Sequence, residues 1–98
     1  MRRDEILETI QANREKIRSY GVASLSLFGS FARNESSEDS DIDLLVAYES
    51  GQPGGLFEFL RLLNFLEDIL GRTVDLVMSD ALREDIRQHV LQEAIRAA

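Results

Sequence analysis

The stretch SLFGSFARNESSEDSDIDLLVAY, residues 26–48, joins a small turn to a pair of carboxylates at the start of an apolar strand. Gly29 and Ser30 make the turn, and ten residues separate them from Asp41 and Asp43. Carboxylates at positions i and i+2 of a strand point to the same face, roughly 7 Å apart along the backbone. Two like charges held this close repel each other, so the pattern favours a divalent cation between them.

The composition is typical of a soluble globular domain. The 98 residues are 44% hydrophobic and 30% charged, which predicts one domain over residues 1–98 with a modest core. There is no cysteine, which excludes disulfides, thiolate nucleophiles and cysteine-ligated metals. A net charge of −7 argues against direct nucleic-acid binding. Without a signal peptide or a segment long enough to span a membrane, we expect a cytoplasmic protein with no membrane partner.

Hydrophobic periodicity predicts helices that alternate with strands, which is an α/β class. The expected helices cover residues 3–20, 31–34 and 56–70, followed by a last one that Ser79 or Asp80 caps. The expected strands cover residues 24–28, 42–48 and 73–78, with loops over 34–40 and 50–55. The residues expected on the inner face of the last helix are Leu82, Ile86, Val90 and Ile95. On the helix over 56–70, Phe57 and Leu60 fall outside the apolar arc and suggest an exposed patch.

A third acid interrupts the strand TVDLVM, residues 73–78, at Asp75. A charge in an apolar strand is costly unless it is paired or bound to a metal. If this strand neighbours the one that carries Asp41 and Asp43, and Asp75 faces the same side, three carboxylates converge. Oxygen ligands of this kind suit Mg²⁺, which keeps several waters and binds substrate phosphates.

The turn at Gly29 and Ser30 fits a phosphate. Gly29 allows close approach of the backbone because it has no Cβ, and Ser30 starts a helix whose free N–H groups suit an anion. A phosphate cradle beside a carboxylate cluster is the layout for phosphoryl or nucleotidyl transfer. One metal would organise a triphosphate and a second would activate the incoming hydroxyl, which Asp75 could orient or deprotonate.

Each of these residues also has a plainer interpretation. Asp41 and Asp43 can form a solvated strand end, and Asp75 can be an edge-strand acid that faces water. The turn serine can cap a helix, which is compatible with phosphate binding. Arg33 can pair with Glu35 or remain a surface charge instead of contacting phosphate.

GSFARNESSEDSDIDLLV, residues 29–46, resembles the GSx₁₀DxD signature of the DNA-polymerase-β-like nucleotidyltransferases. In this size range the chain is most similar to their minimal members, the MNT-type antitoxins that are paired with HEPN-domain toxins. The segment VDLV, residues 74–77, matches the third acidic strand of the family. The resemblance covers residues 24–78 and implies a single minimal nucleotidyltransferase domain. The implied sheet is small and mixed, with three strands or slightly more, and is flanked by helices.

The resemblance implies ATP as co-substrate and two Mg²⁺ sites. By position, Gly29 and Ser30 would hold the β- and γ-phosphates. Arg33 and Ser40 belong to the same matching motif and are assigned to nucleotide binding.

By the same resemblance, Asp41, Asp43 and Asp75 would bind the metal and form the catalytic set. Family antitoxins attach AMP to a tyrosine of the partner HEPN toxin and so silence its RNase, which implies a hetero-oligomer with the toxin.

Two departures and two alternatives accompany the resemblance. Asn34 stands where family members often have glycine, and asparagine tolerates positive φ next best. The loop is unusually acidic, with Glu35, Glu38 and Asp39.

One alternative acceptor is a small molecule such as an aminoglycoside, although 98 residues leave little room for a separate acceptor domain. The other alternative is an antitoxin that acts by binding alone.

Overall fold

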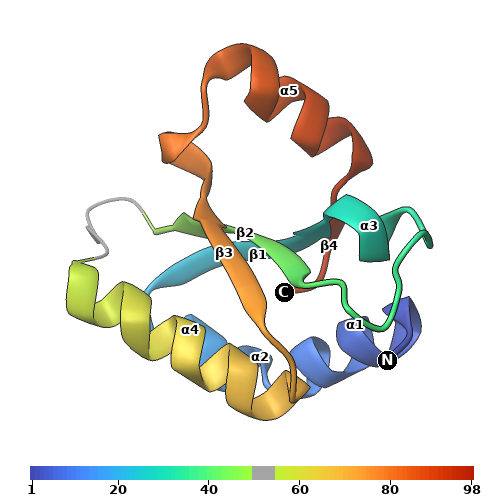
Figure 1. The fold of residues 1–98 in the computed structure, drawn as a ribbon. Coiled ribbons are helices and arrows are strands. Elements are labelled where there is room, and N and C mark those ends of the chain that lie inside the picture. The colour runs from blue at the N-terminus through green and yellow to red at the C-terminus, as the bar shows by residue number, and fades with distance from the viewer. Residues whose placement is uncertain (50–54) are drawn as a thin grey trace.

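The computed structural model describes residues 1–49 and 55–98, and Figure 1 shows one sheet with helices on both sides. The predicted α/β class is confirmed. The loop predicted over 50–55 lies outside the described residues except for Gly55. In chain order the elements are α1 (Arg3–Ala12), α2 (Arg14–Arg18), β1 (Val22–Phe28), α3 (Gly29–Ala32), β2 (Ile42–Tyr48), α4 (Leu56–Leu70), β3 (Val74–Met78), the 3₁₀ turn η1 (Ser79–Ala81), α5 (Glu84–Glu93) and β4 (Ile95–Arg96).

The described residues form one mixed sheet of four strands in the order β3-β2-β1-β4. β1 runs antiparallel to both β2 and β4, whereas β2 and β3 are parallel. The small mixed sheet is therefore confirmed, with one strand more than the three identified from the sequence. That strand contains Ile95, so the prediction that Ile95 lies on the last helix is wrong. The backbone is already extended at Ala94, and Ile95 pairs with Leu27 on the free edge of β1.

The helix predicted over residues 3–20 forms two helices, because the helical backbone is interrupted at Asn13. The backbone of Asn13 lies at φ −109° and ψ 15°, and its side-chain amide donates to the carbonyl of Thr9 at 2.8 Å. Asparagine favours such local hydrogen bonds, which compete with helix continuation. The apolar face survives the break because Ile10 and Ile17 are both fully buried.

The core lies between one face of the sheet and the layer of α1, α2 and α4, drawn below the sheet in Figure 1. The side chains that fill it from the helices are Ile6, Ile10, Ile17, Leu62, Leu66 and Leu70. The side chains that fill the core from β1, β2 and β3 are Leu25, Leu27, Ile42, Leu44, Val46, Val74 and Leu76. Phe57 and Leu60 on α4 are exposed by 76% and 41%, as their place outside the apolar arc predicts.

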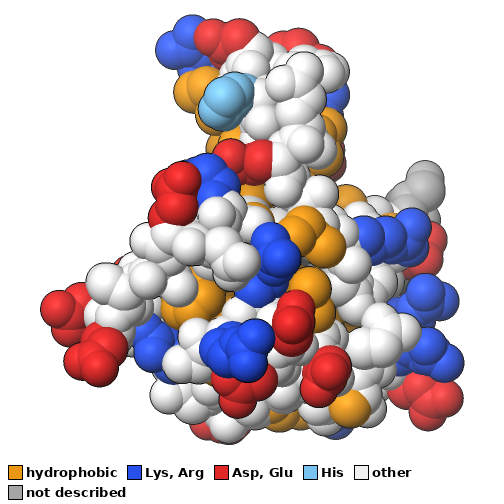
Figure 2. Space-filling model, turned by 90° about the vertical axis from the view of Figure 1, so that its right-hand side faces the viewer, with side chains coloured by type: hydrophobic (Ala, Val, Ile, Leu, Met, Phe, Trp, Pro, Cys, Tyr) orange, Lys and Arg blue, Asp and Glu red, His pale blue; other side chains and the backbone are white. Residues whose placement is uncertain are grey.

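α5 stands apart from this core and projects above the body of the molecule in Figure 2. Within α5, which is described in full, only Val90 is buried. The inner face predicted for the last helix is wrong at Leu82, which lies before α5, and at Ile86, which is 45% exposed. The helix has Arg83, not Ser79 or Asp80, at its N-cap. Within residues 1–49 and 55–98, no helix combines the length and apolarity needed to cross a bilayer.

Candidate functional site

The sheet register places Asp43 and Asp75 side by side. Asp43 pairs with Asp75 across the parallel strands β2 and β3, and with Phe28 across the antiparallel strands β1 and β2. Side chains alternate between the faces of a strand, so Asp43 points away from the face that carries Ile42 and Leu44. The two acids therefore lie on the face of the sheet opposite the α1, α2 and α4 layer, where β1 ends.

Asp41 completes the set of predicted acids. It lies just before β2 and is exposed. The pKa of Asp43 is raised to about 6, first by burial and then by the neighbouring charges of Asp75 and Asp41, while the charge of Arg33 acts in the opposite direction. Asp75 and Asp41 both lie close enough to Asp43 to act on its carboxylate, and the strand register places Asp75 beside Asp43.

Asp43 and Asp75, with Asp41 near them, are the candidate ligands for a cation. Among the described residues, no group of three Asp, Glu or His side chains is gathered closely enough to enclose a metal ion. Mg²⁺ does not need such a cage, because it keeps several waters and uses one or two carboxylates together with substrate phosphates. The donors are all oxygens, and a cation between Asp43 and Asp75 would relieve the repulsion that raises the pKa of Asp43. The residues present therefore fit Mg²⁺.

Gly29 brings the turn directly against Asp43. Gly29 is buried and its φ is +74°, in the region that favours glycine. A Cβ added to Gly29 would collide with the carboxylate of Asp43. Glycine is thus required here both by the backbone angle and by the space that the acid occupies.

Ser30 lies inside α3 and does not cap it. The helix begins at Gly29, with Phe28 at the N-cap position and no side-chain cap. The helix predicted over 31–34 is therefore placed two residues too late, because the positive φ of Gly29 turns the chain into the helix at once. The carbonyl of Ser30 accepts from the backbone N–H of Glu35 at 2.8 Å, which closes the turn after the helix. There Asn34 has a φ of 62°, as expected for this residue.

Arg33 is held by two carboxylates. Its Nε donates to Glu35 Oε2 at 3.1 Å, and its Nη1 donates to both Glu93 oxygens at 3.2 and 3.3 Å. The predicted pairing of Arg33 with Glu35 is confirmed. Glu93 comes from the end of α5 and also accepts from the N–H of Gly29 at 3.2 Å. Sequence reasoning missed Glu93, because nothing in its local pattern indicates where α5 ends relative to α3.

Ser40 and Arg72 fix the loop that leads to the acids. The Oγ of Ser40 accepts from the N–H of Ser37 at 2.9 Å. Nη2 of Arg72 donates to the carbonyls of Glu38 at 2.7 Å and Ser40 at 2.8 Å. The Arg72 guanidinium also lies over the ring of Phe31, 5.3 Å from its centroid. Arg72 thus joins α3 to the loop before Asp41, a role that the sequence does not signal.

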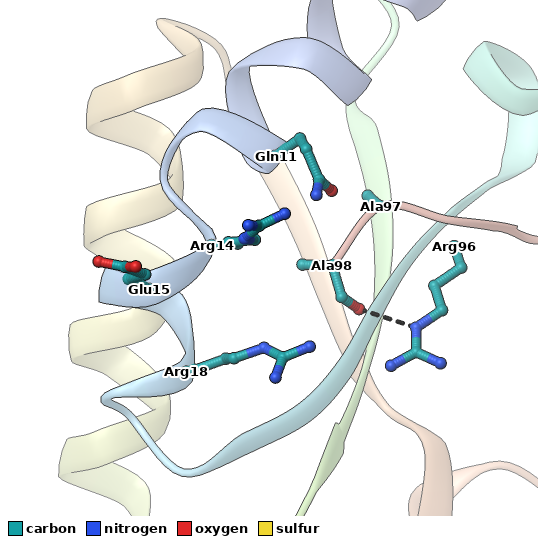
Figure 3. Close-up of a pocket in the computed structure, with 7 residues that line it drawn as sticks. All are labelled: Gln11, Arg14, Glu15, Arg18, Arg96, Ala97 and Ala98. Carbon is teal, nitrogen blue, oxygen red and sulfur yellow. Dashed lines mark hydrogen bonds between the residues drawn. The ribbon is translucent and has the colours of Figure 1, made fainter.

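A hollow lies away from these acids, on the side where α1 and α2 meet the C-terminal residues (Figure 3). It is lined by Gln11, Arg14, Glu15, Arg18, Arg96, Ala97 and Ala98. It shares no residue with the acid site.

Known proteins resemble this chain over most of its length. The family model described as "Nucleotidyltransferase domain" matches residues 6–97. The chain is 39% identical over 93 residues to the protein adenylyltransferase MntA of Thermococcus cleftensis, covering 94% of this chain and 92% of that protein. A solved structure assigned to the minimal nucleotidyltransferases is 45% identical, with a TM-score of 0.73 over 91% of this chain and 93% of that chain.

A more distant likeness shows a shared fold. A chain from a solved complex of the tri-AMPylated Shewanella oneidensis HEPN toxin with MNT antitoxin has a TM-score of 0.65. It is 20% identical and covers 94% of this chain and 71% of that chain.

Proposed function

This chain belongs to the nucleotidyltransferase family, and from that premise we propose that it is an Mg²⁺-dependent protein adenylyltransferase that uses ATP. The observation that carries the proposal is the position of Asp43, which lies between the turn at Gly29 and the carboxylate of Asp75. A glycine turn beside paired carboxylates suits the transfer of a nucleotidyl group.

The proposed reaction follows from the donors at this site. An acceptor hydroxyl attacks the α-phosphorus of ATP, an oxygen–phosphorus bond forms, and the bond to the β-phosphate oxygen breaks to release pyrophosphate. Asp75, exposed at the side of Asp43, would orient the hydroxyl and take its proton. Gly29 and Ser30 would hold the triphosphate through their backbone, and Arg33 and Ser40 line the same end of the sheet.

Two Mg²⁺ ions would be held by Asp41, Asp43 and Asp75. When bound, Mg²⁺ would supply the positive charge that the triphosphate and the leaving pyrophosphate require. The raised pKa of Asp43 supports this assignment, since its cause includes the unbalanced charges of Asp75 and Asp41.

The proposed acceptor is a tyrosine of a cognate HEPN toxin, so that the chain acts as an antitoxin in a hetero-oligomer. Support comes from the relative named protein adenylyltransferase and from the similar fold in the tri-AMPylated HEPN complex. The exposed Phe57 and Leu60 offer an apolar surface for such a partner.

The test uses α-labelled ATP, Mg²⁺ and a HEPN-domain protein from the same organism. We expect the label on the HEPN protein with the wild type and its loss with Asp43→Asn. The matched control is Asp39→Asn, which removes the same charge from the exposed loop and should leave transfer intact. Equal transfer by wild type and Asp43→Asn contradicts the proposal. Label on an added aminoglycoside instead of protein would favour the small-molecule alternative.

A further inference from the structure

The carboxylate of Glu93 accepts hydrogen bonds from the donors of the turn that would bind a triphosphate. One of its oxygens accepts from the N–H of Gly29, and both accept from Arg33. A backbone N–H and a guanidinium are the donors that bind phosphate oxygens elsewhere in proteins. Figure 1 shows how this contact arises, with the end of α5 beside α3.

We propose that Glu93 is a built-in competitor of the triphosphate, whose carboxylate must leave Gly29 and Arg33 before a nucleotide can bind there. This inference rests on the proposed function and adds regulation to the same site. It assigns to α5 a role in setting nucleotide affinity.

The contact is weak enough to be displaced. The Arg33 and Glu93 side chains are 45% and 24% exposed, and ion pairs in contact with water contribute little to stability. The donor–acceptor distances of 3.2–3.3 Å lie at the long end for such bonds. A triphosphate carries more negative charge than one carboxylate and can use the same donors.

The movement required is a rotation of the Glu93 side chain. The backbone directly after it is held, because Ile95 pairs with Leu27 in the sheet. The side chain has no such restraint besides Gly29 and Arg33 among its described hydrogen bonds. The fold can therefore stay intact while the turn opens.

The test measures equilibrium binding of ATP in Mg²⁺ by calorimetry. Glu93→Gln removes the charge and Glu93→Asp shortens the reach, and we expect each to tighten ATP binding by about tenfold, equal to about 1.4 kcal/mol. The matched control is Glu35→Gln, which takes the same charge from the same guanidinium but leaves the N–H of Gly29 blocked. We expect it to change the Kd by less than about threefold, as for an exposed ion pair.

Inorganic tripolyphosphate in place of ATP should show the same order of affinities, because the competition concerns the phosphates alone. Unchanged or weaker ATP binding by both Glu93 variants overturns the inference, and weaker binding would mean that Glu93 positions Arg33 for the nucleotide. In either case ATP binding by the wild type leaves the proposed function standing. If wild type and all variants melt normally yet bind neither ATP nor tripolyphosphate, the proposed function fails as well.

Discussion

The carboxylate of Asp43 occupies the space that a side chain on Gly29 would need. The turn at the end of β1 and the first acid of β2 are therefore built as one unit, since Phe28 pairs with Asp43 across the two strands. A change at either position must affect the other.

Replacing Gly29 by alanine tests this unit. The positive φ alone costs an alanine about 1–2 kcal/mol, and the collision with Asp43 adds to it. We expect the Tm to fall by at least about 4–8 °C and AMP transfer to fall by about 100-fold, since a small displacement of reacting groups is enough for such a loss. Calorimetry and the labelled-ATP assay measure the two effects. Gly71→Ala is the control for the backbone term, because its φ is +66° but its Cβ would meet nothing within 4 Å. Equal activity losses in the two variants would refute the role of the collision.

The raised pKa of Asp43 predicts a pH-dependent stability. The folded protein holds the proton of Asp43 up to about pH 6, whereas the unfolded chain releases it near 3.8. Its contribution to stability is therefore fully present below pH 3.8 and is lost as the pH rises through 6. Asp43→Asn removes this loss. At pH 8 the variant should therefore be more stable than the wild type by about 1 kcal/mol, after allowance for solvent screening, and should have a higher Tm. At pH 5 the difference in stability should be smaller. Melting in EDTA checks this, with Asp39→Asn as the exposed control. A difference that stays the same at both pH values would contradict the expectation.

Added Mg²⁺ should stabilise the wild type at pH 8. An ion that binds only the folded state raises stability by about 2.7 kcal/mol at 100 times its Kd. We expect a rise in Tm that saturates with Mg²⁺, and a much smaller rise in Asp43→Asn and Asp75→Asn. Thermal melts over a magnesium series measure it, with Glu38→Gln in the exposed loop as the control. An equal rise in all four proteins would place the ion elsewhere.

Arg72 should matter for activity although it does not touch the acids. Arg72→Gln removes its hydrogen bonds to Glu38 and Ser40 and its contact with Phe31. We expect about 1–2 kcal/mol of lost stability and a larger loss of transfer, because the loop before Asp41 loses its anchor. Arg61→Gln, exposed on α4, is the control. A transfer rate unchanged by Arg72→Gln would show that the loop is held by other contacts.

The strands and acids could be read from the sequence because their signals are local. Alternating or continuous apolar residues mark β1, β2 and β3, and the GSx₁₀DxD spacing marks the turn and the acids. The break at Asn13 was missed because the apolar residues continue in register on both sides of it. The strand β4 was missed because two residues carry too little pattern, and its existence depends on the free edge of β1.

The charged contacts around the site could not be predicted for a different reason. Glu93 and Arg72 reach the site from elements far along the chain, and both look like ordinary surface charges in sequence. Their positions depend on where α5 ends and how β3 begins, which only the tertiary packing fixes.

The pairing of β4 with β1 has a consequence for how the protein is made. Ser26 and Leu27 pair with Arg96 and Ile95, which leave the ribosome about 70 residues later. Until then the outer edge of β1 stays unpaired, and such an edge can pair with a neighbouring nascent chain. Glu93 is synthesised at the same stage, so a nascent chain would carry the three acids before it carries the residue that accepts from Gly29 and Arg33.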